Sequence, residues 1–258
     1  MDIKIMVAAH KPYKMPEDTT LYLPVFVGSA LRPKPDDSYT ADNTGDNISA
    51  KNTTFNELTA LYWGWKNLDC DYIGLDHYRR YMTLHKSKNI VDVLTSQQLK
   101  KLFQTTDIIL PTKRHYYIET NYSHYIHVHH VEPLELTREI ISKKYPRYLA
   151  SFDKVLKRRS AHMFNMYIMK KSLNDKYCKW LFDILFTLEK QVDVSGYDEY
   201  ERRVFGFVSE LLLDVWLDAN DLSYVEVQKS NLENEHWFRK IFNFLYRKFF
   251  RGHRENVR

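Results

Sequence analysis

Residues 72–81 read Tyr72-Ile73-Gly74-Leu75-Asp76-His77-Tyr78-Arg79-Arg80-Tyr81, a short apolar run followed by a dense group of polar and aromatic side chains. The apolar part predicts a buried strand over residues 72–75, and the polar part falls at its carboxyl end. In open α/β sheets, ligands bind outside the carboxyl ends of the strands. Residues 76–81 therefore predict one wall of a binding crevice.

The segments on both sides of this stretch alternate between strand and helix patterns. Strands are predicted over residues 1–9, 21–27, 107–110, 162–170 and 224–228. Helices are predicted over residues 55–67, 95–103, 133–144, 146–158, 173–191 and 201–217. Residues 32–54 and 112–130 are expected to be long loops, which are often functional. The alternation predicts an α/β fold with a mixed, mostly parallel sheet and helices on both faces.

The charge is unevenly distributed along the chain. The formal net charge is +5, from 38 Lys and Arg against 33 Asp and Glu. Residues 236–258 contain seven basic and one acidic side chain, so residues 1–235 carry 31 basic and 32 acidic ones. This division predicts a near-neutral domain over residues 1–235 and a basic tail over residues 236–258.

Several protein classes are excluded or disfavoured by composition. None of the seven glycines falls in a GxG pattern, so a P-loop and a dinucleotide-binding fingerprint are absent. Two cysteines are too few for a disulfide scaffold, which fits a reducing compartment. No apolar run approaches the ~20 residues of a membrane span, and the first apolar stretch is too short for a signal peptide. We therefore expect a cytoplasmic location.

Three polar clusters follow predicted strands: His10-Lys11, residues 76–80, and residues 111–114. Each cluster alone is better explained as a solvated turn. Together they place His, Lys and Arg around one crevice, which suits a polyanion such as a nucleotide diphosphate. Because a P-loop is absent, a nucleotide-sugar is favoured over an ATP-hydrolysing mechanism.

Five segments carry a resemblance to a known family: residues 7–11, 42–49, 57–67, 74–81 and 203–210. The combination of HYRRY at residues 77–81 with DNTGDNIS at residues 42–49 is specific. The chain resembles a bacterial family of capsular and exopolysaccharide glycosyltransferases formerly treated as a domain of unknown function. The resemblance implies a GT-A-like fold over residues 1–235. It also implies transfer of a hexose, with galactofuranose or galactose as the first guess, from a UDP-sugar to a lipid-linked saccharide.

Two positions depart from the pattern of that family. Relatives usually read Ser-Glu-Arg-Leu where this chain has Ser209-Glu210-Leu211-Leu212, so a role for that Arg does not transfer. The position of Asp76 is commonly apolar or Cys in relatives, which weakens a metal-binding role for it.

An inverting transferase needs a base that deprotonates the acceptor hydroxyl. The resemblance favours Glu210 for this role over an ordinary carboxylate on a helix face, and Asp46 is the second candidate. A retaining mechanism remains open. Tyr62 and Trp65 are interpreted as core residues or as a stacking surface for uracil. The residues assigned to the donor are His10, Lys11, Asn47, Asn52, Tyr62, Trp65, Lys66, His77, Tyr78, Arg79 and Arg80.

The charge of the leaving diphosphate must be neutralised, and two alternatives remain open. One is a divalent cation, Mn²⁺ or Mg²⁺, held through Asp76, which offers a single carboxylate beside His77. The only Asp-x-Asp sequence, residues 69–71, precedes its strand and lies at the wrong end of the sheet. The other alternative is neutralisation by cationic side chains alone, without any metal.

The resemblance assigns the acceptor to Tyr125, His129 and Asn165. The four histidines His124, His127, His129 and His130 also raise the alternative of a zinc site, flanked by Glu119 and Glu132. In that alternative His127 and His129 share one face of a strand. For Asn165, a turn at a strand end is an equally good explanation.

Aromatic and aliphatic residues recur every three or four positions over residues 236–251, with basic residues on the other face. This pattern is typical of an amphipathic helix in a membrane interface, and the alternative is a helix docked on the body or on a dimer partner. We therefore expect attachment to the inner face of the cell membrane. A nucleic-acid-binding module is disfavoured by the near-neutral body. A non-catalytic nucleotide-sugar-binding scaffold remains an alternative.

Overall fold

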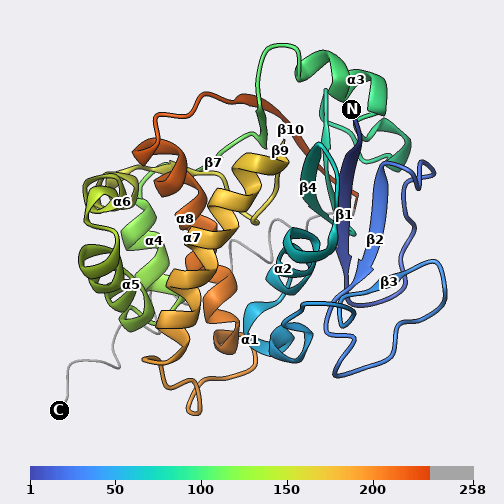
Figure 1. Cartoon of the computed structure of the whole chain (residues 1–258). Coiled ribbons are helices and arrows are strands. Elements are labelled where there is room, and N and C mark those ends of the chain that lie inside the picture. Colours follow the sequence, from blue (N-terminus) through green and yellow to red (C-terminus); the bar gives the residue numbers. More distant parts are fainter. Residues whose placement is uncertain (233–258) are drawn as a thin grey trace.

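An eight-stranded sheet forms the centre of the protein (Figure 1). The computed structural model describes residues 1–232. The strands are β1 (Ile3–Ala9), β2 (Tyr22–Phe26), β3 (Thr40–Ala41), β4 (Tyr72–His77), β5 (Arg80–Thr83), β6 (Ile108–Pro111), β9 (Tyr167–Lys170) and β10 (Val225–Asn231). A separate two-stranded sheet pairs β7 (Arg114–His115) with β8 (Ser160–Ala161).

Parallel and antiparallel pairings are equally frequent in the large sheet. The four parallel pairs are β3–β2, β2–β1, β1–β4 and β6–β10. The four antiparallel pairs are β4–β5, β5–β10, β4–β9 and β6–β9. The expected mixed sheet is therefore confirmed, but its mostly parallel character is not. The difference arises because β5 turns back after only two residues, Tyr78 and Arg79, and pairs with the end of β4.

Helices cover both faces of the sheet, as the sequence predicts. They are α1 (Asn52–Phe55), α2 (Leu58–Asn67), α3 (Ser96–Leu102), α4 (Asn121–Val128), α5 (Glu132–Lys144), α6 (Leu149–Lys157), α7 (Lys171–Glu189) and α8 (Val204–Ala219). Even-numbered residues of β1, such as Met6, pack in the core that contains α2, α7 and α8. Odd-numbered ones, such as Val7, pack in a second core with Leu99 of α3. This alternation follows from the two-residue period of a strand.

Three predicted elements differ in detail from the structure. The helix expected over residues 55–67 is interrupted at Asn56, whose φ of 50° no α-helix accommodates. The loop expected over residues 112–130 contains α4. Only β9 is a strand of the main sheet within residues 162–170, because Phe164 and Asn165 adopt left-handed backbone conformations with φ values of 76° and 55°.

Within residues 1–232, no helix has both the length and the apolar character needed to cross a membrane. The predicted amphipathic helix over residues 236–251 and the predicted domain boundary at residue 235 lie outside the described residues.

Candidate active site

The carboxyl ends of β1 and β4 lie side by side and bring the first two polar clusters together. Ala8 and His77 are in register, and the Tyr78 N–H donates to the Ala8 carbonyl at 3.1 Å. The His10 ring then meets the Tyr78 ring edge-on, with the ring centroids 5.2 Å apart. Parallel pairing of β1 with β4 thus places residues 68 positions apart in one site.

A turn at residues 162–165 links the end of β4 to α8. The Phe164 N–H donates to Glu210 Oε1 at 3.2 Å, and His77 Nε2 lies 2.7 Å from the Phe164 carbonyl oxygen. The Asn165 side chain donates to Glu57 Oε1 at 2.8 Å and accepts from the Ser209 hydroxyl at 2.9 Å. The two left-handed residues therefore connect the end of β4, the start of α2 and the middle of α8.

A buried pair holds this turn in place. His162 Nδ1 pairs with Asp214 Oδ1, and the His162 N–H donates to Asp214 Oδ2 at 3.0 Å. Asp214 lies one turn after Glu210 on α8, so both carboxylates project from the same side of that helix. Left-handed conformations of non-glycine residues cost free energy and persist where the surroundings fix them. The His162–Asp214 pair provides part of that fixation.

The Glu210 carboxyl has a raised pKa, close to neutral pH. Burial and the nearby Glu57 carboxylate raise its pKa to about 7, although Arg114, the Phe164 N–H and Arg80 act in the opposite direction. Burial also lowers the pKa of His77, so its imidazole is neutral at pH 7. Glu210 is thus able to accept a proton near neutral pH, as a general base must. Arg114, whose charge acts on Glu210, belongs to the third polar cluster.

Glu57 is a member of the site that sequence reasoning missed as a functional residue. It immediately precedes α2, behind the break in the helix at Asn56. Arg203 Nε donates to the Asn56 side-chain oxygen at 3.1 Å, which fixes this break against the start of α8. The one sequence signal for Glu57 was its position at the start of residues 57–67, a segment that carries the family resemblance.

The charges of four cations, Lys11, Arg32, Arg79 and Arg203, act on His10, and we call these four residues the cationic rim. Burial lowers the pKa of His10, and the charges of these four side chains lower it further. Lys11 and Arg79 each lie 5.5 Å from the centre of the Tyr78 ring. Four positive charges beside a neutral imidazole form a site for an anion with several charges.

Asn52 supports this rim rather than lying in it. Its side-chain oxygen accepts a hydrogen bond from Arg32 at 3.2 Å, and its amide nitrogen donates to the Asn56 carbonyl at 2.8 Å. Gly28 has a φ of 73°, and a Cβ there would lie 2.7 Å from the Asn52 oxygen. The close approach of backbone and side chain at this point therefore requires glycine.

The DNTGDNIS segment organises the loop through its first aspartate. Asp42 is fully buried and accepts hydrogen bonds from the Gly28 and Ser29 N–H groups, both at 2.9 Å, and from Thr59 at 2.6 Å. Asn47 bonds within the same loop, donating to the Gly45 carbonyl at 2.9 Å. The hydrogen bonds that Asn47 makes in the described structure thus lie within its own loop, since its side-chain oxygen also accepts from the Ser49 N–H.

Asp46, Tyr62, Trp65 and Lys66 form a separate group toward the other end of α2. The Tyr62 hydroxyl donates to Asp46 at 3.1 Å, and Lys66 Nζ lies 3.5 Å from the same carboxylate and 4.1 Å from the Trp65 ring centre. An α-helix rises about 1.5 Å per residue, so Lys66 lies about 13 Å along α2 from Glu57. These four predicted residues are therefore not grouped with Glu210.

Asp76 faces the opposite side of the sheet from His77. It is 0% exposed, and burial raises its pKa to about 8. One of its oxygens accepts from the Met82 N–H at 3.4 Å, and the other has no hydrogen-bond partner in the described part of the chain. Among residues 1–232, no group of three or more His, Cys, Asp or Glu side chains is arranged to hold a metal ion. A single carboxyl in an apolar core does not fit Mn²⁺ or Mg²⁺.

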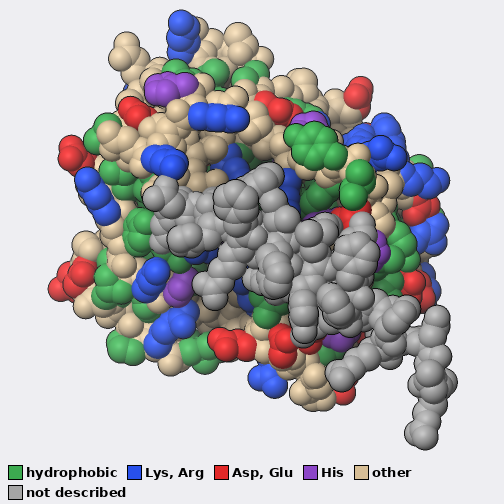
Figure 2. All heavy atoms as spheres, turned by 180° about the vertical axis from the view of Figure 1, so that it is seen from behind, with side chains coloured by type: hydrophobic (Ala, Val, Ile, Leu, Met, Phe, Trp, Pro, Cys, Tyr) green, Lys and Arg blue, Asp and Glu red, His purple; other side chains and the backbone are tan. Residues whose placement is uncertain are grey.

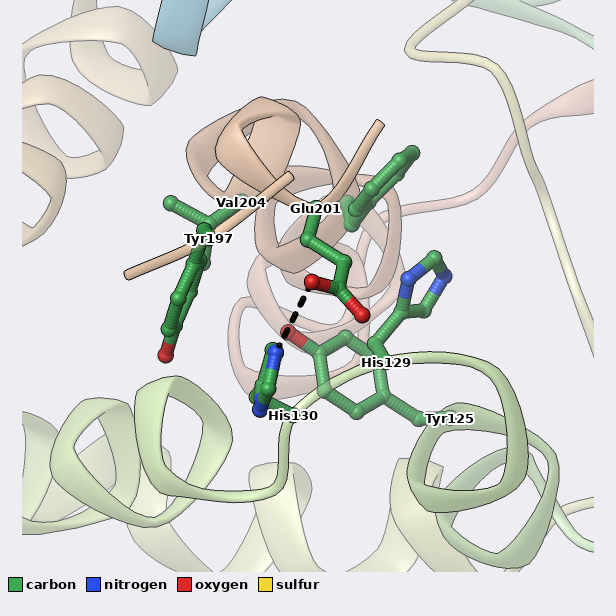
Figure 3. A pocket seen from close by; sticks show the side chains of 7 residues that line it. Tyr125, His129, His130, Tyr197, Glu201 and Val204 are labelled. Carbon is green, nitrogen blue, oxygen red and sulfur yellow. Dashed lines mark ion pairs between the residues drawn. The ribbon is translucent and has the colours of Figure 1, made fainter. Parts of the chain in front are cut away.

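The predicted acceptor residues Tyr125 and His129 lie beside the site on α4 and its end, in a pocket of about 10 Å³ (Figure 3). The Tyr125 hydroxyl is buried without a hydrogen-bond partner among the described residues, and after burial the charges of Tyr197 and Glu210 contribute most to raising its pKa. His129 stacks on Phe207, with the ring centroids 4.0 Å apart. The charge of Glu210 thus acts on Tyr125, a residue that lines this pocket.

The predicted strand that carries His127 and His129 on one face is wrong, because residues 121–128 form α4. His124 and His127 each bond Glu119 through Nδ1, at 2.9 and 2.7 Å. His130 instead pairs with Glu201 at 3.2 Å (Figure 3). The four histidines are therefore divided between two places, and they do not form a zinc site in the described structure.

Comparisons with known proteins agree with this architecture. The chain is similar to the apo structure of WbbM, a bifunctional glycosyltransferase, with 29% identity and a TM-score of 0.78 over 91% of this chain and 46% of that chain. It therefore spans about half the length of WbbM. No curated protein gives a significant match. The family model for the domain of unknown function DUF4422 matches residues 4–221, and the chain therefore belongs to the DUF4422 family.

Proposed function

We propose that the protein is an inverting glycosyltransferase that moves a hexose from a UDP-sugar to a lipid-linked saccharide during polysaccharide synthesis. The first candidates for the hexose are galactofuranose and galactose. The observation that carries the proposal is the buried Glu210 carboxyl, with a pKa of about 7, which accepts from the Phe164 N–H in the turn that also contacts His77. The 29% identity to a bifunctional glycosyltransferase supports the same reaction class.

In the proposed reaction, Glu210 takes the proton of the acceptor hydroxyl as that oxygen attacks the anomeric carbon. The bond from the anomeric carbon to the phosphate oxygen breaks, and UDP leaves with the electron pair. The cationic rim stabilises the charge that develops on the diphosphate. Asn165 and Glu57 fix the turn whose Phe164 N–H holds Glu210, so they position the base. Tyr125 and His129 are proposed to border the acceptor rather than to enclose it, because their pocket of about 10 Å³ has room for no more than a water molecule.

The cationic rim favours neutralisation of the diphosphate without a metal ion. The proposal therefore assigns no step to Asp76 and none to Mn²⁺ or Mg²⁺. Asp46 and Tyr62, Trp65 and Lys66 are likewise left without a catalytic or donor-binding role. Turnover should be the same with EDTA as with added manganese, and strict dependence on manganese would overturn this part of the proposal.

We further propose that the protein works at the inner face of the cell membrane, where lipid-linked acceptors are found. The basic residues 236–251 are the proposed attachment, since each basic residue near an anionic surface contributes ~1 kcal/mol. This part of the proposal rests on the sequence pattern alone.

The decisive experiment measures UDP release over a panel of UDP-sugars with a lipid-linked saccharide acceptor. The chain should turn over one of these donors, and Glu210→Gln should lower kcat by about 10²–10⁴-fold, the contribution typical of a general base. Glu139→Gln is the matched control, because Glu139 is exposed on α5 and pairs only with Lys143 among the described residues. Absence of turnover with every donor, or full activity of Glu210→Gln, would contradict the proposal.

A further inference from the structure

The loop after β7 exposes two large apolar side chains at its tip. Tyr117 is 88% exposed and Ile118 is 75% exposed. The loop is not loosely attached, because the Tyr116 N–H donates to the Arg159 carbonyl at 2.7 Å and the β7–β8 pairing anchors its base. A fixed backbone therefore presents apolar side chains to solvent, which marks an interaction site when it occurs in a suitable surface.

The two chain segments at this tip are rich in basic residues. Residues 113–118 and 154–160 together contain six Lys and Arg and no Asp or Glu. Residues 1–235 as a whole are close to neutral. On the face of the molecule in Figure 2, basic and acidic side chains are interspersed, as a near-neutral body requires. We call residues 113–118 and 154–160 the tip surface.

Part of the positive charge of the tip surface is already paired. Lys154 and Arg158 both contact Asp218, and Lys113 Nζ lies 3.7 Å from Glu226. Lys157 and Arg159 are exposed, as is Arg114. The surface therefore combines an apolar tip with several solvent-accessible cations.

We infer that the tip surface binds an anionic lipid membrane, with Tyr117 and Ile118 inserted between the headgroups. Apolar side chains at the tip and cations around it match the two layers of such a surface, the acyl boundary and the charged headgroups. A tyrosine suits the interface because its ring is apolar and its hydroxyl is polar. An isoleucine offers no stacking surface for a base, so a nucleic acid fits the tip less well.

The tip surface is connected to the part of the structure that contains Glu210, so membrane binding at the tip bears on the candidate active site. Arg114 lowers the pKa of Glu210, and Glu210 in turn contributes to raising the pKa of Tyr116 to about 12. The β7–β8 pair at the base of the tip runs directly into the turn at residues 162–165, whose Phe164 N–H contacts Glu210. If the proposed function holds, the contact brings a lipid-linked acceptor to the crevice, but the membrane contact itself does not rest on that function.

The test labels the tip in the full chain. In a Cys70→Ser background, Ile118→Cys carries an environment-sensitive NBD fluorophore. In the control, Val91→Cys carries it, at an apolar residue that is 63% exposed and lies outside the tip surface. The remaining Cys178 is fully buried. With vesicles containing phosphatidylglycerol, emission from position 118 should shift to the blue and intensify, while emission from position 91 should not change. No sugar nucleotide is present, so failure of the proposed enzymatic function does not affect this readout.

Charge removal provides the second arm. Lys157→Gln together with Arg159→Gln should weaken binding to anionic vesicles by about fivefold for each charge removed. Vesicles of phosphatidylcholine alone should give no shift at position 118. The inference is overturned if the label at position 118 stays in a water-like environment on anionic vesicles, whether or not the chain binds them through other residues. It is also overturned if the tip binds an RNA oligonucleotide and never inserts into vesicles.

Discussion

Asp76 and His77 are neighbours in the chain but lie on opposite faces of the sheet, and each face contains a carboxyl group with a raised pKa. On the Asp76 face, burial raises the pKa of that carboxyl to about 8, and a single backbone N–H contacts it within hydrogen-bonding range. On the His77 face, the pKa of Glu210 is about 7, and Arg80, Arg114, Glu57 and the Phe164 N–H all act on it. A raised pKa alone reports burial, whereas convergence of several polar groups on the same carboxyl distinguishes a candidate reactive site.

The largest expected effect concerns stability on the Asp76 face. A carboxyl whose pKa is higher in the folded state than in the unfolded state binds more protons when folded, so stability falls as pH rises between the two pKa values. Between pH 5 and pH 8 this amounts to about 4 kcal/mol for Asp76, at about 1.4 kcal/mol per pH unit. Asp76→Asn cannot titrate at this position, so it lacks this loss of stability. Between pH 5 and pH 8, the free energy of unfolding of the wild type should therefore fall by about 4 kcal/mol relative to that of Asp76→Asn.

Urea unfolding at pH 5 and pH 8 measures this difference, and the contribution of Glu210 cancels because both proteins contain it. An equal pH dependence in the two proteins would show that Asp76 is not held protonated. The claim that each face of the sheet contains a carboxyl group with a raised pKa would then be wrong. Activity at pH 7 should be unchanged in molecules that remain folded, since Asp76 does not face the crevice.

A smaller effect is expected from the cationic rim on the His77 face. Arg79→Gln removes one of the charges proposed to contact the diphosphate, and a charge-assisted hydrogen bond contributes ~1.5–3 kcal/mol. We therefore expect KM for the sugar nucleotide to rise by about tenfold or more, with a much smaller change in kcat. Steady-state kinetics measures both constants, and a change confined to kcat would contradict the role of the rim.

The smallest effect is expected at the other end of α2. Lys66→Gln should leave KM and kcat within about twofold, because Lys66 lies about 13 Å along the helix from Glu57. This variant is the matched control for Arg79→Gln, since both replace an exposed or half-buried cation beside an aromatic ring. A rise in KM as large as that of Arg79→Gln would move the donor site toward Tyr62 and Trp65, where the sequence interpretation also placed it.

The sequence predicted the parts of the fold that local patterns determine. β1, β4, α3 and α7 were all recognisable, since buried strands and amphipathic helices have a periodicity. α4 was missed because four histidines and two tyrosines give residues 121–130 no clear apolar stripe. β5 was missed because its hairpin turn, Tyr78-Arg79, contains neither glycine nor asparagine.

For the candidate site, the sequence predicted that His10, His77 and Arg80 lie near one another because they follow strands, and their role in binding stays a prediction. Glu210 and Asn165 were selected through a family resemblance, and the structure brings them close to His77. Glu57 was not predicted as a functional residue, because its place depends on the helix break at Asn56 and on the left-handed turn at residues 164–165. Both are tertiary features in which non-glycine residues adopt conformations that their own preferences disfavour.

The most direct test of the account is the pH dependence of kcat/KM for sugar transfer, measured for the wild type and for Asp76→Asn. A general base with a pKa of about 7 predicts that kcat/KM rises with pH and levels off near pH 7, because the base must be unprotonated. The same break near pH 7 should appear in Asp76→Asn. A break near pH 4.5 in the wild type, or a break that disappears in Asp76→Asn, would contradict the assignment of the reaction to Glu210 and the His77 face.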